Sequence, residues 1–328
     1  MSMSVAIIGC GLVGRKRAAA LGPARLLCCA DSVPERAEAL ADLHPGCVAL
    51  ASWQEAVAHP SVTLVIIATT HNALPMIAAA AIRRGLHILI EKPGARTADE
   101  LRTLVELAER YCVKVQVGYN HRHHPALRLA HALASEGRIG TLTHLRASYG
   151  HGGRPGYERE WRFHHQISGG GELLDQGSHL IDLSVWFLGP VQHVSSLLSN
   201  AFWRGEVEDN AFLLLKSANG KVAQLHASWT EWKNKFCFEV FGTLGKIEVS
   251  GLGGSYGEER LTLSVMRPEM GPPDQTHWTF PLEDTSWAQE FAHFLSDIAE
   301  NRVPEPGLAG ALQVLEVVGQ AYAEARRS

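Results

Sequence analysis

The stretch from Ser4 to Asp31, SVAIIGCGLVGRKRAAALGPARLLCCAD, decides the fold. Its first five residues form a continuous apolar run, as expected of a strand that is buried on both faces. The pattern GxGxxG follows at Gly9, Gly11 and Gly14, and a helical stretch comes next. A second apolar run then ends at Asp31. Strand, glycine turn, helix, strand and acid therefore occur in the order of a dinucleotide-binding βαβ unit.

Each glycine of this turn has its own expected role. Gly9 permits the tight turn, Gly11 lets the backbone approach a pyrophosphate, and Gly14 allows the helix to pack closely on the strand. The first helical turn, which begins with Leu12 and Val13, offers unsatisfied N–H groups to the phosphates. We therefore expect all five residues to contact the cofactor.

Asp31 bears on the choice of cofactor. A carboxylate at the end of the second strand accepts hydrogen bonds from the ribose hydroxyls, and its charge repels a 2′-phosphate. Arg36, five residues later, has a positive charge that would attract a 2′-phosphate and so weakens the preference for NAD. It is a further expected cofactor contact. The sequence favours NAD over NADP.

Apolar strands and amphipathic helices continue to alternate as far as Val117, which predicts an α/β fold with a doubly wound parallel sheet. Ligands of such a sheet bind beyond the carboxyl ends of its strands. The expected ligand contacts at these ends are Thr69 and His71, then Glu91 and Lys92 of Glu91-Lys92-Pro93, and finally Tyr119 and Asn120. The proline fixes the backbone beside Lys92, which we expect near the nicotinamide.

Composition excludes several classes of partner. The chain has 328 residues, is 46% hydrophobic and has a formal net charge of -4, with no run of Lys or Arg. It therefore predicts no nucleic-acid or membrane partner. The N-terminal apolar run lacks a preceding basic region and enters the glycine turn directly, so it reads as a strand and the protein is expected in the cytoplasm.

The second half of the chain is rich in strands. We assign residues 1–122 to a dinucleotide-binding domain and residues 123–328 to an α+β domain with a large, mostly antiparallel open sheet. The second domain is expected to bind substrate and to form the oligomer, and its last helix is able to pack back on the first domain.

The segment SGGGELLDQGSHLIDLSVWFLGP, Ser168–Pro190, places polar side chains in an apolar helix predicted over 172–188. Asp175 and His179 are four residues apart and should share one face. Asp182, three residues further on, is placed to hold the His179 imidazole. The three glycines should let the chain pass close to cofactor and substrate without a colliding side chain.

Together these motifs resemble the Gfo/Idh/MocA superfamily of glucose–fructose oxidoreductase and inositol dehydrogenase. The resemblance covers essentially the whole chain. It rests on the glycine turn, ATTHNALP at 68–75, EKP at 91–93, VGYNHRHHP at 117–125, and WRFHHQISGGGELLDQGSHLID at 161–182. It implies a catalytic set of Lys92, Asp175 and His179, and a homodimer or homotetramer built through the second sheet.

The chemistry suits these residue types. Oxidation of a secondary alcohol requires a base for the hydroxyl proton, and His179 has a suitable side chain. Lys92 stabilises the developing alkoxide and relays the proton, while Asp175 positions the substrate and His179. Tyr119 and Arg122 are further expected substrate contacts.

Several further tryptophan, arginine and histidine residues are candidates for contacts or for packing. Trp161 and Arg162 are expected near the cofactor or the polar end of the substrate. Trp229 and Trp232 either stack on a sugar or pack in the protein or at a subunit contact. His123 and His124 depart from the family pattern, and no HExxH or Cys/His spacing accompanies them, so no metal is expected.

The sequence thus predicts an NAD(P)-dependent oxidoreductase acting on CH–OH groups, with a ring hydroxyl of a sugar, sugar derivative, nucleotide-linked sugar or cyclitol as substrate. One alternative is a glycosidase that uses NAD for transient oxidation and elimination. A non-catalytic NAD-binding regulator is another, although it would need none of the three catalytic residues.

Overall fold

The computed structural model describes residues 3–327 and divides into two compact units that are discontinuous in sequence. Unit 1 consists of residues 3–119, 166–168 and 287–312. Unit 2 consists of residues 120–165, 169–286 and 313–327. Among the described residues, no helix has the length and apolar character needed to cross a membrane.

Unit 1 is built on a six-stranded parallel sheet in the order β3-β2-β1-β4-β5-β6. This arrangement confirms the doubly wound α/β sheet expected from the alternating pattern. The strands are β1 Ser4–Ile8, β2 Arg25–Ala30, β3 Val48–Leu50, β4 Leu64–Ile67, β5 His87–Glu91 and β6 Val115–Gly118. The helices of the alternating region are α1 Leu12–Ala19, α2 Pro34–Asp42, α3 Trp53–Ala58, α4 Leu74–Arg83 and α5 Ala98–Tyr111.

The core of unit 1 includes residues from near the end of the chain. The central strands bury side chains such as Val5 and Ile66 completely. Phe291 and Phe294 of α9 (Ser286–Ala299) belong to the same buried cluster. The final helix, α10, spans Leu308–Ala325.

Unit 2 contains an eight-stranded sheet in the order β14-β13-β12-β11-β7-β10-β9-β8. All neighbouring strands are antiparallel except β7 and β10, so the mostly antiparallel sheet predicted from the sequence is confirmed. The strands are β7 Leu142–Gly150, β8 Val191–Ser199, β9 Asn210–Ser217, β10 Val222–Ser228, β11 Lys235–Gly242, β12 Gly245–Ser250, β13 Arg260–Val265 and β14 Asp274–Thr279.

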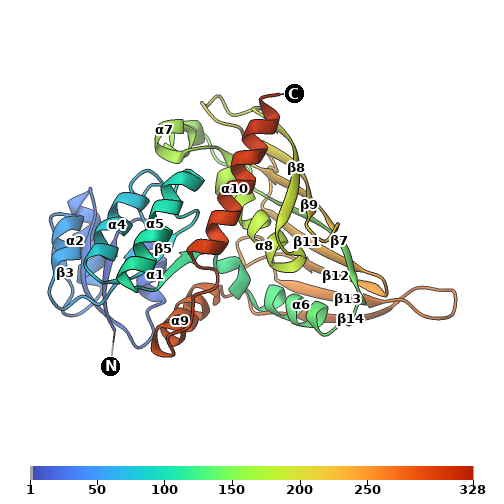
Figure 1. Cartoon of the computed structure of the whole chain (residues 1–328), viewed down its shortest axis with the longest axis horizontal. Helices are drawn as coiled ribbons and strands as arrows, with labels where there is room; N and C mark the ends of the chain where they lie inside the picture. The colour runs from blue at the N-terminus through green and yellow to red at the C-terminus, as the bar shows by residue number, and fades with distance from the viewer. Residues whose placement is uncertain (1–2, 328) are drawn as a thin grey trace. The chain divides into compact units, whose positions relative to one another are not determined.

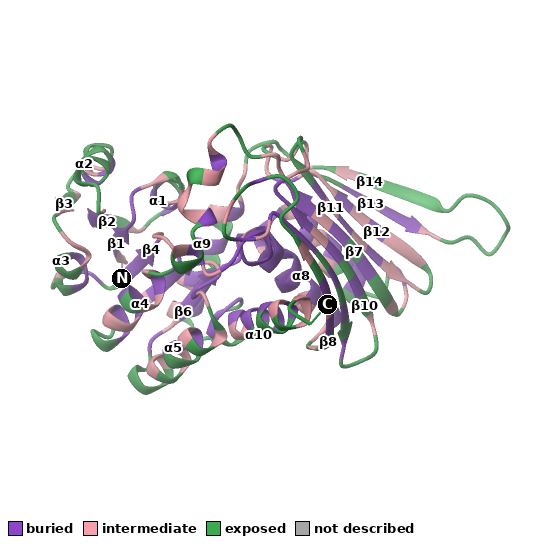
Figure 2. Ribbon diagram, turned by 90° about the horizontal axis from the view of Figure 1, so that it is seen from above, coloured by how far each residue is buried: buried purple, intermediate pink, exposed green. Residues whose placement is uncertain are grey.

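Helices α6 (Pro125–Ser135) and α8 (Ser178–Leu188) pack on one face of this sheet, α6 against β12 and β13 and α8 against β7 and β10 (Figure 1). Burial alternates along β9 and β10, so their other side chains remain exposed, and β14 is exposed along most of its length (Figure 2). The remaining helical segments are η1 Asn120–His123, η2 Tyr157–Arg159, η3 Trp161–Phe163, α7 His165–Ser168 and η4 Leu173–Gly177.

The helix predicted over 172–188 is not continuous. Its first part, η4, is a π-helical turn, and the α-helix begins only at Ser178. Wide turns of this kind occur frequently at functional sites. Here the turn carries Asp175, while His179 lies in the first turn of α8.

Candidate active site

The glycine turn of unit 1 has two closely packed positions and one open position. A Cβ on Gly14 would lie 1.9 Å from the carbonyl oxygen of Gly9, and a Cβ on Gly9 would lie 2.3 Å from that of Ala68. Gly9 also has a φ of +93°, which side chains rarely adopt. These two glycines are therefore required by the fold itself.

Gly11 differs, because a Cβ there would meet nothing within 4 Å. It precedes α1 and has no side-chain cap, so the first N–H groups of that helix face an open position. Leu12, the first residue of α1, is exposed. This open, uncapped helix start fits the diphosphate of NAD, which needs close backbone approach and N–H donors.

Asp31 is fixed at the end of β2 by two backbone groups. The N–H of Cys10 donates to Oδ2 at 2.6 Å, and the N–H of Val33 donates to Oδ1 at 2.9 Å. The carboxylate therefore lies beside the glycine turn, where a ribose bound to that turn would meet it. Arg36 is exposed on α2.

Arg17 is a residue that the sequence analysis missed. It follows the glycine turn on α1, and its side chain is only 1% exposed. Its Nε donates to Glu91 at 2.6 Å and its Nη1 donates to Glu290 at 2.5 Å. Burial alone would lower the pKa of Arg17, but the charges of Glu290 and Glu91 outweigh burial and raise it. Glu91, expected as a cofactor contact, is thus engaged in a buried ion pair.

The remaining unit 1 candidates lie at strand ends. Lys92 is partly buried directly after β5, and Tyr119 is fully buried after β6. Thr69 is partly buried after β4. The ring of His71 is buried, and its Nδ1 lies 2.8 Å from the carbonyl oxygen of Ser168. His71 therefore binds the short segment that precedes the three glycines.

Two of those glycines, Gly170 and Gly171, are closely packed within unit 2. A Cβ on Gly170 would lie 2.0 Å from the hydroxyl of Tyr322, and one on Gly171 would lie 2.0 Å from the carbonyl oxygen of Glu208. The Glu208 carboxylate accepts hydrogen bonds from the N–H groups of Gly171 and Leu173, each at 3.1 Å. Close packing within unit 2 explains these two glycines, without invoking a ligand.

Asp175 and Arg162 are brought together in unit 2. Nε of Arg162 donates to Oδ2 of Asp175 at 3.0 Å. Burial acts to lower the pKa of Arg162, but the charge and hydrogen bond of Asp175, together with Tyr157 and Glu160, outweigh burial and the pKa is raised. Trp161 is partly buried, with the Arg162 guanidinium 4.8 Å from its ring centroid. The carboxylate of Asp175 is therefore ion-paired with a neighbouring cation.

His179 lies in a buried group of rings. It stacks on His121, with ring centroids 3.7 Å apart, and His121 meets Tyr149 and His124 edge to face. His124 Nδ1 in turn lies 3.0 Å from Glu259 Oε2. The histidine-rich segment at 121–124 thus packs beside the expected base. Among residues 3–327, no group of three or more His, Cys, Asp or Glu side chains is arranged to hold a metal ion.

Asp182 does not take the role suggested for it. Both of its oxygens accept hydrogen bonds from Arg122, at 2.7 and 2.8 Å. Burial raises the pKa of Asp182, and Arg122 opposes that rise. The expectation that Asp182 orients His179 is therefore replaced by an Arg122–Asp182 ion pair. Asn120 donates to Ser286 Oγ at 2.8 Å, and its Oδ1 lies 3.3 Å from His121 Nδ1.

Trp229 and Trp232 differ clearly in how far their side chains are buried. Trp229 is completely buried in an aromatic cluster with Tyr157 and Phe163, and it serves packing. Trp232 is 62% exposed.

Known proteins resemble this chain over its full length. Levoglucosan dehydrogenase of Pseudarthrobacter phenanthrenivorans is 25% identical over 367 residues, which cover 95% of this chain and 93% of that protein. Inositol 2-dehydrogenase of Rhizobium meliloti is 25% identical over 344 residues, which cover 100% and 99%. A solved structure of levoglucosan dehydrogenase with NADH and levoglucosan shares the fold, with a TM-score of 0.91 at 24% identity, covering 100% of this chain and 98% of that one.

Two family models match as well. Residues 3–119 match the oxidoreductase family with an NAD-binding Rossmann fold, and residues 127–248 match the GFO/IDH/MocA C-terminal domain. Because these matches cover well over half of the chain, the protein belongs to the Gfo/Idh/MocA oxidoreductases and uses NAD as its cofactor.

Proposed function

We propose that this protein is an NAD-dependent dehydrogenase that oxidises a ring secondary hydroxyl of a sugar, sugar derivative or cyclitol to a ketone. The observation that carries this proposal is the arrangement in unit 2 of a buried imidazole, His179, four residues after a carboxylate, Asp175, that is ion-paired with Arg162. A base and a fixed anion on one short segment suit the binding and deprotonation of a diol.

Each residue of the proposed set has one task. His179 takes the proton of the reacting hydroxyl, since an imidazole titrates near neutral pH. Lys92 stabilises the negative charge that develops on the substrate oxygen and relays the proton. Asp175 accepts a hydrogen bond from a neighbouring hydroxyl and thereby orients the ring. NAD, when bound, supplies the hydride acceptor.

The rest of the expected site is proposed on the same basis. The adenosine and diphosphate part of NAD is bound by Gly9, Gly11, Leu12, Val13, Gly14, Asp31 and Arg36. The remainder of the cofactor site is formed by Thr69, His71, Glu91, Asn120, Trp161 and Arg162. The substrate is contacted by Tyr119 and Arg122. Glu91 and Arg122 act through their ion-pair partners, Arg17 and Asp182.

The relatives support a polyhydroxylated ring as substrate, because they are a levoglucosan dehydrogenase and an inositol dehydrogenase by name. The test is a panel of free sugars, anhydrosugars, inositols and nucleotide-linked sugars, each with NAD and with NADP. The readout is the absorbance of the reduced cofactor. NADH formation with at least one ring alcohol is expected. Cleavage of a glycoside without net NADH would instead identify the glycosidase reaction.

We further propose a homo-oligomer built through the exposed face of the unit 2 sheet. Leu197, Phe212 and Leu214 are 65%, 45% and 52% exposed on neighbouring strands β8 and β9. Leu197 pairs directly with Phe212 across the two strands. A contiguous apolar face of this kind is typical of a protein contact.

A further inference from the structure

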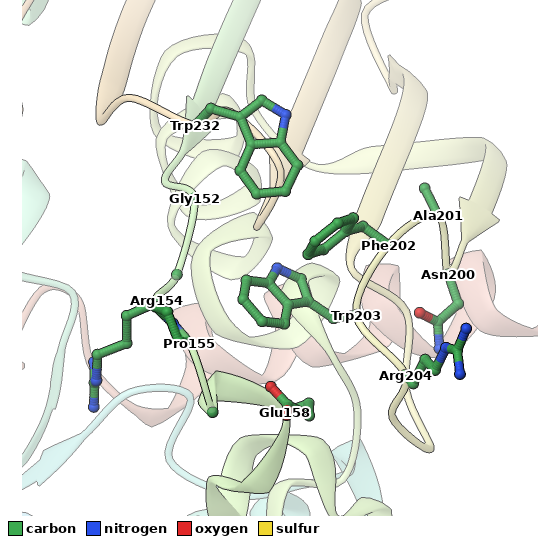
Figure 3. A pocket seen from close by; sticks show the side chains of 12 residues that line it. Gly152, Arg154, Pro155, Glu158, Asn200, Ala201, Phe202, Trp203, Arg204 and Trp232 are labelled. Atoms are coloured by element: carbon green, nitrogen blue, oxygen red, sulfur yellow. The ribbon is translucent and has the colours of Figure 1, made fainter.

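Unit 2 contains a second feature that the proposed chemistry does not use, an open hollow of about 1200 Å³ lined by aromatic and charged side chains (Figure 3). Trp232, Phe202 and Trp203 gather around it, while Arg154 and Arg204 lie on opposite sides of these rings. Its volume slightly exceeds the roughly 300–1,000 Å³ of common small-molecule sites. The hollow is therefore large enough for one ring and its substituents.

The exposed rings of the hollow are held in place without a ligand. Phe202 is 57% exposed and meets Trp232 edge to face, with ring centroids 4.7 Å apart. The loop that carries Phe202 is anchored by Asp209, whose carboxylate accepts hydrogen bonds from three successive N–H groups, those of residues 201–203, at 2.8–2.9 Å. A rigid loop that presents an aromatic side chain to water loses little conformational entropy on binding.

Trp232 has an unusual backbone. Its φ of +55° is rare for a bulky residue and carries a conformational cost. Gly152 lies against it, because a Cβ on Gly152 would approach the Cα of Trp232 to 2.8 Å. Gly153 similarly leaves room for Trp203 and Tyr157, which a Cβ there would approach to 2.8 and 2.7 Å. Several residues thus cooperate to present the indole of Trp232 at the rim.

A chain of ion pairs links the hollow to the candidate active site within unit 2. Arg154, which lines the hollow, pairs with Glu160. Glu160 also pairs with Arg162 at 3.4 Å, and Arg162 holds Asp175 at 3.0 Å. The lining of the hollow is therefore three ion pairs away from the carboxylate proposed to orient the reacting ring.

We propose that this hollow binds a second, flat-faced ring that is covalently attached to the ring that is oxidised, so that the substrate is a two-ring conjugate. This inference rests on the proposed function. The ring stacks on Trp232 and Phe202, and its hydroxyl or anionic groups reach Arg204. A second sugar ring and the base of a nucleotide-linked sugar share this chemistry, since both present a flat face with polar edges.

The test compares probes of one and two rings on the full-length protein saturated with NADH, so that no oxidation takes place. D-glucose, cellobiose and UDP-glucose are titrated calorimetrically into the wild type and into Trp232→Ala, Phe202→Ala and Tyr111→Ala. Tyr111 is exposed at the end of α5 in unit 1 and serves as the matched aromatic control. The melting temperature of each variant is measured first, and two rim variants are used in case one fails to fold.

We expect cellobiose or UDP-glucose to bind the wild type at least 10-fold more tightly than D-glucose. Trp232→Ala and Phe202→Ala should reduce that advantage to about 2-fold, while Tyr111→Ala retains it. Preference for cellobiose identifies a second sugar, and preference for UDP-glucose identifies a nucleotide. Equal binding of all three probes, or an advantage that survives both rim substitutions, would overturn the proposal.

Further results distinguish this inference from the proposed dehydrogenase function and from a contact between copies of the chain. If single-ring sugars reduce NAD efficiently while two-ring probes bind no better, the dehydrogenase function stands and the hollow inference fails. If no ring alcohol reduces NAD but a two-ring probe still depends on Trp232, the inference about the hollow stands and the reaction is wrong. A change of oligomer mass in Trp232→Ala, with probe binding unchanged, would mark the hollow as a contact between copies and overturn the proposal.

Discussion

The imidazole of His121 lies face to face with that of His179, with ring planes only 24° apart. Two parallel rings this close cannot both carry a positive charge without strong repulsion in a buried site. His121 also presents a flat surface that limits how the His179 ring can turn.

We expect His121→Ala to lower turnover roughly 10- to 100-fold, because a base that is no longer held in position loses much of its effect. His121→Phe should recover most of that loss, since it restores a flat ring. Steady-state NADH formation with the best substrate of the panel measures both variants. Equal damage in the Ala and Phe variants would show that the imidazole itself, and not the stack, is needed.

Lys92→Ala and His179→Ala should each reduce turnover by at least about 100-fold, within the usual range for acid–base groups. NAD binding should be unaffected, because neither side chain is assigned to the diphosphate. Fluorescence titration with NADH provides that control. Near-normal turnover in both variants would refute the assigned roles.

Gly11 and Gly14 provide a matched pair in one turn. Gly11→Ala should fold with an unchanged melting temperature, since its Cβ meets nothing within 4 Å, but bind NADH at least about 10-fold more weakly. Gly14→Ala should destabilise the protein severely, because its Cβ would lie 1.9 Å from a backbone oxygen. Thermal unfolding and NADH titration distinguish the two effects. Tight NADH binding by Gly11→Ala would place the diphosphate elsewhere.

Glu290 predicts a pH dependence of stability. Burial raises its pKa to about 7, with Arg17 opposing and Glu91 adding to the rise. An unfolded chain loses this proton near the ordinary value of 4.5, whereas the folded protein retains it to about pH 7. The stabilising contribution is therefore complete below about pH 4.5 and is lost as the pH rises to about 7.

Glu290→Gln should remove this dependence and leave the protein at least as stable at pH 8, because the amide oxygen still accepts from Arg17. The difference in free energy of unfolding across the window is on the order of 3 kcal/mol, since each pKa unit corresponds to about 1.4 kcal/mol. Urea unfolding at several pH values measures it. Glu38→Gln, at an exposed position on α2, is the control. An unchanged pH profile in Glu290→Gln would contradict this account.

The exposed sheet face gives a prediction about assembly. Phe212→Glu and Leu214→Glu should each lower the oligomer mass, because a charge would be buried at an apolar contact. Light scattering after gel filtration measures the mass. Lys216→Glu on the same strand serves as the charge control. A wild-type protein that is already monomeric would rule out this interface.

The sequence predicts those helices and strands that can be recognised from the hydrophobic pattern of their own residues. The strand at Ser4–Ile8 follows from its continuous apolar run and has the expected bounds. Strand β14 was missed, since Asp274–Thr279 is an edge strand with mostly polar, exposed residues. The same explanation does not extend to β12, whose Ile247 and Val249 alternate with polar residues, although no strand is predicted there from the sequence.

Parts of the site depend on partners far away in the chain. Arg17 reads as a surface residue, because Glu91 and Glu290 lie 74 and 273 positions later. The reason for Gly171 was equally hidden, since Glu208 is 37 positions away. Asp182 was assigned to His179 by helical spacing, whereas Arg122, 60 positions earlier, binds it. Helical spacing shows which side chains share one face of a helix, but it does not show which distant residues contact that face.

The presence of Phe291 and Phe294 in the core of the NAD-binding sheet has a consequence for biosynthesis. A nascent chain that has delivered only residues 3–122 from the ribosome has all six strands, yet it lacks both rings and leaves Arg17 with one of its two carboxylates. The first unit can therefore reach its final packing only when synthesis is nearly finished, and a gene fragment ending at residue 122 should yield an incompletely folded product.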